Sequence, residues 1–180
     1  MDIHVKQLWV TRHTAVDVAP GICYGATDVG LKPTFAQEAE AVRQKLIDFR
    51  PDIVLSSPLS RALRLAHAVG YPDVKTDDRL REQSFGDWEM QRYDDIDDPQ
   101  MARWYKDYVN EAPTNGESFA RVVERVGQFI EECRTSEYQN ILVFAHGGVQ
   151  MAVGAYLGLY PMIEAPQHYA GYGSVLKYQL

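Results

Sequence analysis

The chain has 180 residues, of which 46% are hydrophobic and 24% are charged, and it carries a formal net charge of −7. This composition is typical of a globular protein with one core of its own, and it favours a single domain over residues 1–180. The acidic balance argues against a broad nucleic-acid-binding surface and against an anionic membrane surface as partner.

The N-terminal sequence MDIHVKQLWV has no basic segment followed by a long apolar run, so the sequence predicts no secretory signal peptide. No apolar stretch approaches the roughly 20 residues of a membrane span. Cys23 and Cys133 fit neither a disulfide framework nor a zinc site, and we interpret them as reduced thiols. Together these features predict a cytoplasmic protein.

The first half of the chain predicts two strands and two helices around a Gly- and Pro-rich loop. In chain order, these are a strand over 5–11, a loop over 17–33, a helix over 35–49, a strand over 52–57 and a helix over 58–70. The strands are apolar runs, and the first helix repeats apolar residues every three or four positions. Pro58 suits the first turn of the second helix, and Gly70 suits its end.

The second half begins with a segment of mixed composition over 74–89, which we interpret mostly as loop. It continues with a helix over 98–109 that carries aromatic residues, an amphipathic helix over 119–133, a strand over 140–148, an apolar helix over 149–159 and a strand over 173–180. The alternation of strands and helices predicts a three-layer α/β/α sandwich with a mainly parallel central sheet.

Three of the predicted strands end in residues that suit an anion. The first ends in Arg12 and His13, the second leads to Arg61 in a following helix, and the third ends in His146 and Gly147. Ligands of open α/β sheets bind outside the carboxyl ends of the strands, where helix N-termini also present free N–H groups. Each residue alone is more typical of a solvated loop or an ion pair. Their convergence predicts a phosphate or carboxylate site.

A histidine in a phosphate site can donate a hydrogen bond, or it can attack phosphorus as a neutral imidazole and form a covalent intermediate. Flanking arginines would neutralise the charge on the phosphoryl oxygens in the transition state. The reaction also needs an acid to protonate the leaving oxygen. Glu82, between Arg81 and the aromatic Phe85, is the candidate, and Asp87 and Glu89 compete with it.

At this point the ordered motifs resemble the histidine phosphatase superfamily, which has the phosphoglycerate mutase-like fold. The motifs are TRH after a strand, YGATDVGL, SSPLSRAL, RLREQSFGDWE, NGESF and FAHGG, and they extend over residues 8–157. The resemblance implies roles for six residues: nucleophile His13, phosphoryl-binding Arg12, Arg61 and His146, a phosphate contact from the backbone of Gly147, and proton donor Glu82. It also implies that the reaction needs no metal and no other cofactor.

Within that superfamily, FGDWEM followed by PTNGESF looks most like the α-ribazole phosphatases, which remove phosphate from α-ribazole 5′-phosphate or the phosphorylated corrinoid built from it. The sequence departs from the family pattern at Thr14, where most members have Gly, and it lacks an Asn that often follows. Thr14 either narrows the pocket or adds a phosphate contact, and Tyr24 or Thr27 would replace the missing Asn contact.

We therefore expect a small phosphorylated substrate, no nucleic-acid or membrane partner, and a monomer or homodimer. The alternatives are a broad-specificity phosphatase, a phosphoglycerate mutase of the same fold, and a non-catalytic protein that binds phosphorylated ligands. Trp104, Tyr105 and Tyr108 either line the substrate mouth or pack within a helix. His4 and His67 lie away from the strand-end cluster in sequence.

Overall fold

The computed structural model describes residues 5–180, so His4 and the start of the N-terminal segment lie outside the described residues. It contains a five-stranded sheet in the order β3-β2-β4-β1-β5. The strands are β1 (Gln7–Arg12), β2 (Ile53–Ser56), β3 (Lys75–Thr76), β4 (Asn140–Ala145) and β5 (Val175–Gln179). The α-helices are α1 (Phe35–Lys45), α2 (Ser60–Ala68), α3 (Gln100–Lys106), α4 (Phe119–Thr135) and α5 (Gly147–Tyr156). Short 3₁₀ helices cover Asp78–Leu80, Gly86–Trp88, Tyr93–Asp95 and Met162–His168.

The sheet is parallel except at one edge. β1 and β2 both pair in parallel with β4, and β5 pairs antiparallel with β1. The register places Arg12 opposite Ala145 and Ser56 opposite Phe144. The three central strands therefore end side by side, at the edge where the sequence predicted a site.

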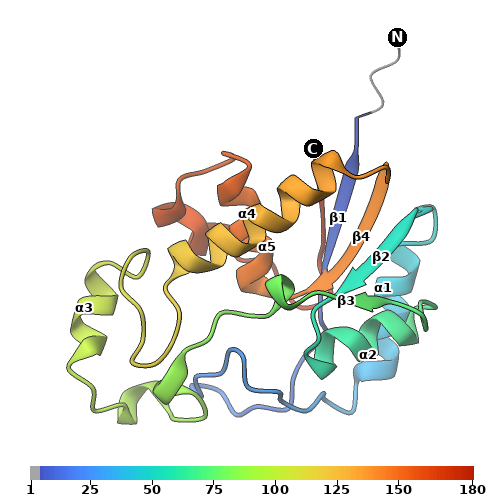
Figure 1. Ribbon diagram of the computed structural model, residues 1–180. Helices are drawn as coiled ribbons and strands as arrows, with labels where there is room; N and C mark the ends of the chain where they lie inside the picture. The colour runs from blue at the N-terminus through green and yellow to red at the C-terminus, as the bar shows by residue number, and fades with distance from the viewer. Residues whose placement is uncertain (1–4) are drawn as a thin grey trace.

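Helices cover both faces of the sheet (Figure 1). Ile141 and Val143 of β4 pack in the core beneath α4 and α5, while Leu142 and Phe144 pack with α1 and α2. This alternation follows from the pleat of a strand, which points successive side chains to opposite faces. The predicted α/β/α sandwich with a mainly parallel sheet is confirmed. No helix within residues 5–180 is both long and apolar enough to cross a membrane.

Three helix starts differ from the prediction, each by two residues, and one of them is α3, which begins at Gln100 rather than Asp98. Pro58 lies before α2 rather than in its first turn, because Leu59 keeps an extended backbone and donates its N–H to the Ser57 hydroxyl. Conversely, α5 begins at Gly147, directly after His146. Both glycines of the HGG sequence therefore belong to the first turn of α5 and not to a strand.

Candidate active site

Four of the predicted residues meet at the carboxyl ends of the central strands. Arg12 ends β1 and His13 follows it, His146 follows β4, and Arg61 stands in the first turn of α2, which follows β2. The imidazole centroids of His13 and His146 are 5.2 Å apart. All four residues are at most 3% exposed. Two cations and two imidazoles are therefore held together inside the protein with little access to water.

The hydrogen bond of His13 determines which ring nitrogen is free. Nδ1 lies 2.8 Å from the carbonyl oxygen of Thr14. A carbonyl oxygen can only accept, so Nδ1 carries the proton and Nε2 of the neutral ring keeps its lone pair. Burial, together with the charges of Arg61 and Arg12, lowers the pKa of His13 from 6.5 to about 3 although the Thr14 hydrogen bond opposes this. His13 is thus a neutral imidazole at physiological pH.

His146 is held from the other side, by Ser57. Its Nε2 lies 2.7 Å from the Ser57 hydroxyl oxygen, which accepts from Leu59 N–H at 3.2 Å and keeps its own proton for the imidazole. Nδ1 is buried without a hydrogen-bond partner among residues 5–180. Burial and the charge of Arg61 lower the pKa of His146 well below its usual value. This arrangement favours a neutral ring whose Nδ1–H can donate to a ligand.

Arg12 is fixed by the segment that leads into β5. Its guanidinium donates to the carbonyl of Ala170 and the hydroxyl of Tyr169, both at 2.5 Å. It also lies over the rings of Tyr169 and Tyr172, with 4.3 and 4.2 Å to the centroids. Arg12 forms no ion pair within the described part of the chain, so its positive charge is available to an anion.

Arg61 is fixed in the same way by a different loop. It donates to the carbonyls of Thr27 and Gly25 at 2.9 and 2.5 Å, and the nearest carboxylate, that of Asp28, lies 4.0 Å away. A carbonyl orients a guanidinium without neutralising it. The buried Nε of Arg61 has no hydrogen-bond partner among the residues described. Both arginines therefore contribute nearly full charge to the site.

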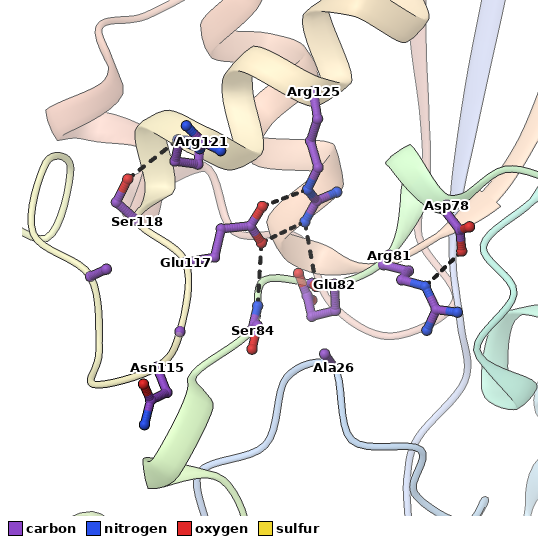
Figure 2. A pocket seen from close by; sticks show the side chains of 12 residues that line it. Ala26, Asp78, Arg81, Glu82, Ser84, Asn115, Glu117, Ser118, Arg121 and Arg125 are labelled. Atoms are coloured by element: carbon purple, nitrogen blue, oxygen red, sulfur yellow. Dashed lines mark hydrogen bonds and ion pairs between the residues drawn. The ribbon is translucent and has the colours of Figure 1, made fainter.

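Glu82 lies beside this cluster, at the N-terminus of α5. Its Oε2 accepts from Gly148 N–H at 3.2 Å. The segment that carries Glu82 is fixed by Arg125 of α4, which donates to the backbone carbonyls of Arg79 and Glu82. Arg125 in turn forms an ion pair of 2.7 Å with Glu117 (Figure 2). Glu82 lines both the cavity of about 580 Å³ drawn there and a second of about 360 Å³. The second, which we call the mouth, also contains Gly148.

The two competing carboxylates have other partners. Asp87 is exposed, and it accepts from the side chain of Asn115 at 2.8 Å. Glu89 accepts four hydrogen bonds, from the backbone N–H groups of Ala26, Thr27 and Phe85 and from the Thr27 hydroxyl. Burial would raise the pKa of Glu89, but these bonds outweigh it and lower the pKa. Glu89 therefore stays ionised and joins the loop behind Arg61 to the loop of Glu82.

The structure also places the remaining predicted residues. Tyr24 lines the mouth, with its hydroxyl 2.7 Å from that of Tyr172. Thr27 instead supports Arg61 through its carbonyl and donates its hydroxyl to Glu89. Thr14 contributes its carbonyl to His13, while its buried hydroxyl has no partner within residues 5–180. A Cβ on Gly147 would lie 2.4 Å from the ring of Tyr169, so this position requires glycine.

Sequence reasoning missed the residues that orient the cluster. Ser57, Tyr169 and Tyr172 were not singled out, and Glu89 was considered only as an acid. Ser57 stands within the SSPLSRAL motif, which offered a signal, whereas the segment with both tyrosines follows no recognisable pattern. Among residues 5–180 no group of three His, Cys, Asp or Glu side chains is placed to hold a metal ion. Both cysteines are free and buried.

Known proteins share this fold and are similar to this sequence. The family model of the histidine phosphatase superfamily (branch 1) matches residues 8–179. An adenosylcobalamin/alpha-ribazole phosphatase of Escherichia coli strain K12 is 35% identical over 153 residues, which cover 79% of this chain and 74% of that protein. A glucosyl-3-phosphoglycerate phosphatase of Mycolicibacterium vanbaalenii is 30% identical over 172 residues, covering 87% of this chain and 76% of the relative.

Among solved structures, the alpha-ribazole phosphatase from Shigella flexneri has a TM-score of 0.85 and 30% identity, over 95% of this chain and 89% of that one. These matches confirm the resemblance that the ordered motifs indicated and the fold that it implied. The relatives are named as phosphatases, which agrees with a site built to hold a phosphoryl group. This chain belongs to the histidine phosphatase superfamily.

Proposed function

We propose that this chain is a metal-independent phosphomonoesterase that forms a phosphohistidine intermediate on His13. The observation that carries the proposal is the state of His13, a buried neutral imidazole with a free Nε2. It lies between Arg12, which forms no ion pair among residues 5–180, and Arg61, whose nearest carboxylate, that of Asp28, is 4.0 Å away. A protonated imidazole has no lone pair for attack, and a site without free cations would repel a phosphate dianion.

In the first step, Nε2 of His13 attacks phosphorus and forms the N–P bond as the bond to the leaving oxygen breaks. The side chains of Arg12, Arg61 and His146 donate to the phosphoryl oxygens, where negative charge accumulates. Glu82, which enters this step protonated, gives its proton to the leaving alcohol. The alcohol departs neutral, and the enzyme holds a phosphohistidine and a carboxylate.

In the second step, a water molecule attacks the same phosphorus. The Glu82 carboxylate takes a proton from the water, the new P–O bond forms, and the N–P bond breaks. Inorganic phosphate leaves, and His13 returns to a neutral imidazole with Nδ1–H donating to Thr14. Glu82 ends protonated and ready for the next substrate, so no other proton carrier is needed.

The substrate that we propose is α-ribazole 5′-phosphate, or the adenosylcobalamin 5′-phosphate precursor, in cobalamin biosynthesis. Two relatives named for alpha-ribazole, at 35% and 30% identity, support this choice over the glucosyl-3-phosphoglycerate activity of another relative. The lining of the mouth also supports it, because Tyr24, Phe85 and Tyr93 suit a flat apolar leaving group better than a carboxylated sugar.

The test is phosphate release, in the presence of a chelator, from α-ribazole 5′-phosphate, p-nitrophenyl phosphate, 3-phosphoglycerate and ribose 5-phosphate. We expect the highest kcat/KM for the ribazole ester, an acid-labile phosphoryl-enzyme after rapid quenching, and loss of nearly all activity and label in His13→Ala. Activity abolished by the chelator, or label retained in His13→Ala, would contradict the mechanism. Phosphoglycerate isomerisation that requires bisphosphate priming would identify a mutase instead.

A further inference from the structure

A third cavity lies against the mouth and is lined almost entirely by aromatic and aliphatic side chains. It has a volume of about 330 Å³, and its wall includes Trp104, Tyr105 and Tyr108. It shares Gln83, Phe85 and Met151 with the mouth. We call this cavity the aromatic pocket. Gln83 directly follows Glu82 in the chain, so the pocket begins one residue from the proposed proton donor.

Core packing explains Phe119, which is a core residue, and Tyr108, which packs against that core, but it does not explain Trp104 and Tyr105. Helix α3, which carries Trp104 and Tyr105, has no buried residue. Figure 1 shows it set off from the sheet, beyond the ends of the strands. The ring of Trp104 has edge contacts with Phe85 and Trp88, at centroid distances of 6.1 and 5.6 Å. Its indole N–H is buried without a hydrogen-bond partner among residues 5–180.

Exposed apolar side chains also gather at this end of the molecule. Tyr105 is 64% exposed on the aromatic pocket, and Tyr169 is 52% exposed on the mouth. Ile163, whose carbonyl accepts from the hydroxyl of Tyr108, is 57% exposed. Large apolar side chains at the entrance of a site indicate an apolar ligand, because their exposure to water is unfavourable and a bound apolar group would relieve it.

We propose that the aromatic pocket binds a heteroaromatic ring carried by the leaving alcohol while the phosphate lies against His13. This inference rests on the proposed phosphatase function. It assigns the substrates to a chemical class, 5′-monophosphates of heterocyclic ribosides, in which a ribose spans from the mouth to the pocket. The ring stacks with the aromatic side chains that line the pocket.

The test compares three substrates with the same ribose 5′-phosphate: α-ribazole 5′-phosphate, adenosine 5′-monophosphate and ribose 5-phosphate. The first two carry a heterocycle and the third does not. The ratio of kcat/KM for either nucleotide to kcat/KM for ribose 5-phosphate therefore measures the contribution of the ring. We expect Trp104→Ala and Tyr105→Ala each to lower this ratio about tenfold, mainly through KM, since each variant removes one stacking partner of the ring. Their activity on ribose 5-phosphate should remain within about twofold of the wild type.

Tyr156→Ala is the matched control, because it removes an aromatic ring on α5 that lines neither the mouth nor the aromatic pocket. Preference for α-ribazole 5′-phosphate that both pocket variants retain would overturn the subsite and leave the proposed function standing. Preference for adenosine 5′-monophosphate that both variants lose would support the subsite while rejecting the named substrate. A wild-type enzyme that hydrolyses ribose 5-phosphate as well as both nucleotides would overturn the subsite.

Discussion

Glu89 offers the sharpest test of how the candidate site is held, because its one carboxylate connects two loops of that site. Oε1 accepts from Ala26 and Phe85 N–H at 3.0 and 2.8 Å, and Oε2 accepts from the Thr27 N–H and hydroxyl. In Glu89→Gln an amide NH₂ replaces one of these oxygens. In place of Oε1 it would face two N–H donors, and in place of Oε2 it would face the Thr27 N–H, although the Thr27 hydroxyl could turn to accept from it. At least one backbone N–H therefore loses its charged acceptor, and at this half-buried position we expect the free energy of unfolding to fall by about 1.5–3 kcal/mol.

The effect on catalysis should act through Arg61, whose acceptors Gly25 and Thr27 lie in the loop that Glu89 holds. We expect kcat/KM for p-nitrophenyl phosphate to fall about 10- to 100-fold, and the inhibition constant of inorganic phosphate to rise in parallel. Glu124→Gln, on the exposed surface of α4, is the control and should change neither. Lower stability with unchanged kcat/KM and unchanged phosphate affinity would show that Glu89 does not position Arg61.

Three further predictions concern the reacting groups themselves. Glu82→Gln should slow the hydrolysis of alkyl phosphates by about 10²-fold or more. It should slow the hydrolysis of p-nitrophenyl phosphate much less, because that leaving group needs no proton. Equal losses on both substrates would show that Glu82 is not the acid. Gly148→Ala should lower kcat, because the added Cβ would lie 2.2 Å from Glu82 Oε1 and displace that carboxylate. Gly30→Ala is the control and should leave kcat unchanged, because no atom lies within 4 Å of its added Cβ. Circular dichroism should show that both variants are folded. His13 should show no titration by NMR between about pH 5 and 8, because its pKa lies at about 3. Below about pH 6.5 His13 binds a proton in the unfolded state but not in the folded state, so the free energy of unfolding decreases as the pH is lowered, by about 2 kcal/mol at pH 5. His13→Gln lacks this group, so urea unfolding should show a loss of stability between pH 8 and pH 5 that is smaller by about 2 kcal/mol than that of the wild type. Titration of His13 near 6.5 would contradict a buried neutral nucleophile.

The strand-end cluster could be predicted because its members share one position, after a predicted strand, although none of them is diagnostic alone. An apolar run that stops at Arg12 and His13, and another that stops at His146, mark strand ends, and parallel pairing brings those ends together. The register of β1 and β4 shows this directly, because it pairs Arg12 with Ala145, the residue before His146. The convergence of these residues at one edge of the sheet was therefore accessible from local pattern and from the resemblance of the ordered motifs.

The residues that orient the cluster could not be found in this way, because their partners are distant in sequence. Tyr169 reaches Arg12 across 157 positions, and Ser57 reaches His146 across 89. No periodicity or spacing encodes such contacts; they depend on the tertiary packing of loops. Likewise, β3 has only two residues, Lys75 and Thr76, both exposed, and so lacks the apolar run by which a strand is recognised.

The support of Arg12 by Tyr169 and Ala170 has a consequence for how the enzyme comes into being. Arg12 is synthesised 157 positions before Tyr169, which helps to orient it, and the edge strand β5 follows later still. A nascent chain that stops before Tyr169 can therefore contain all the residues proposed to touch the phosphate and still lack the contacts that orient Arg12. We expect phosphatase activity to require residues 169–179 as well, so that phosphate chemistry is delayed until the whole sheet can assemble.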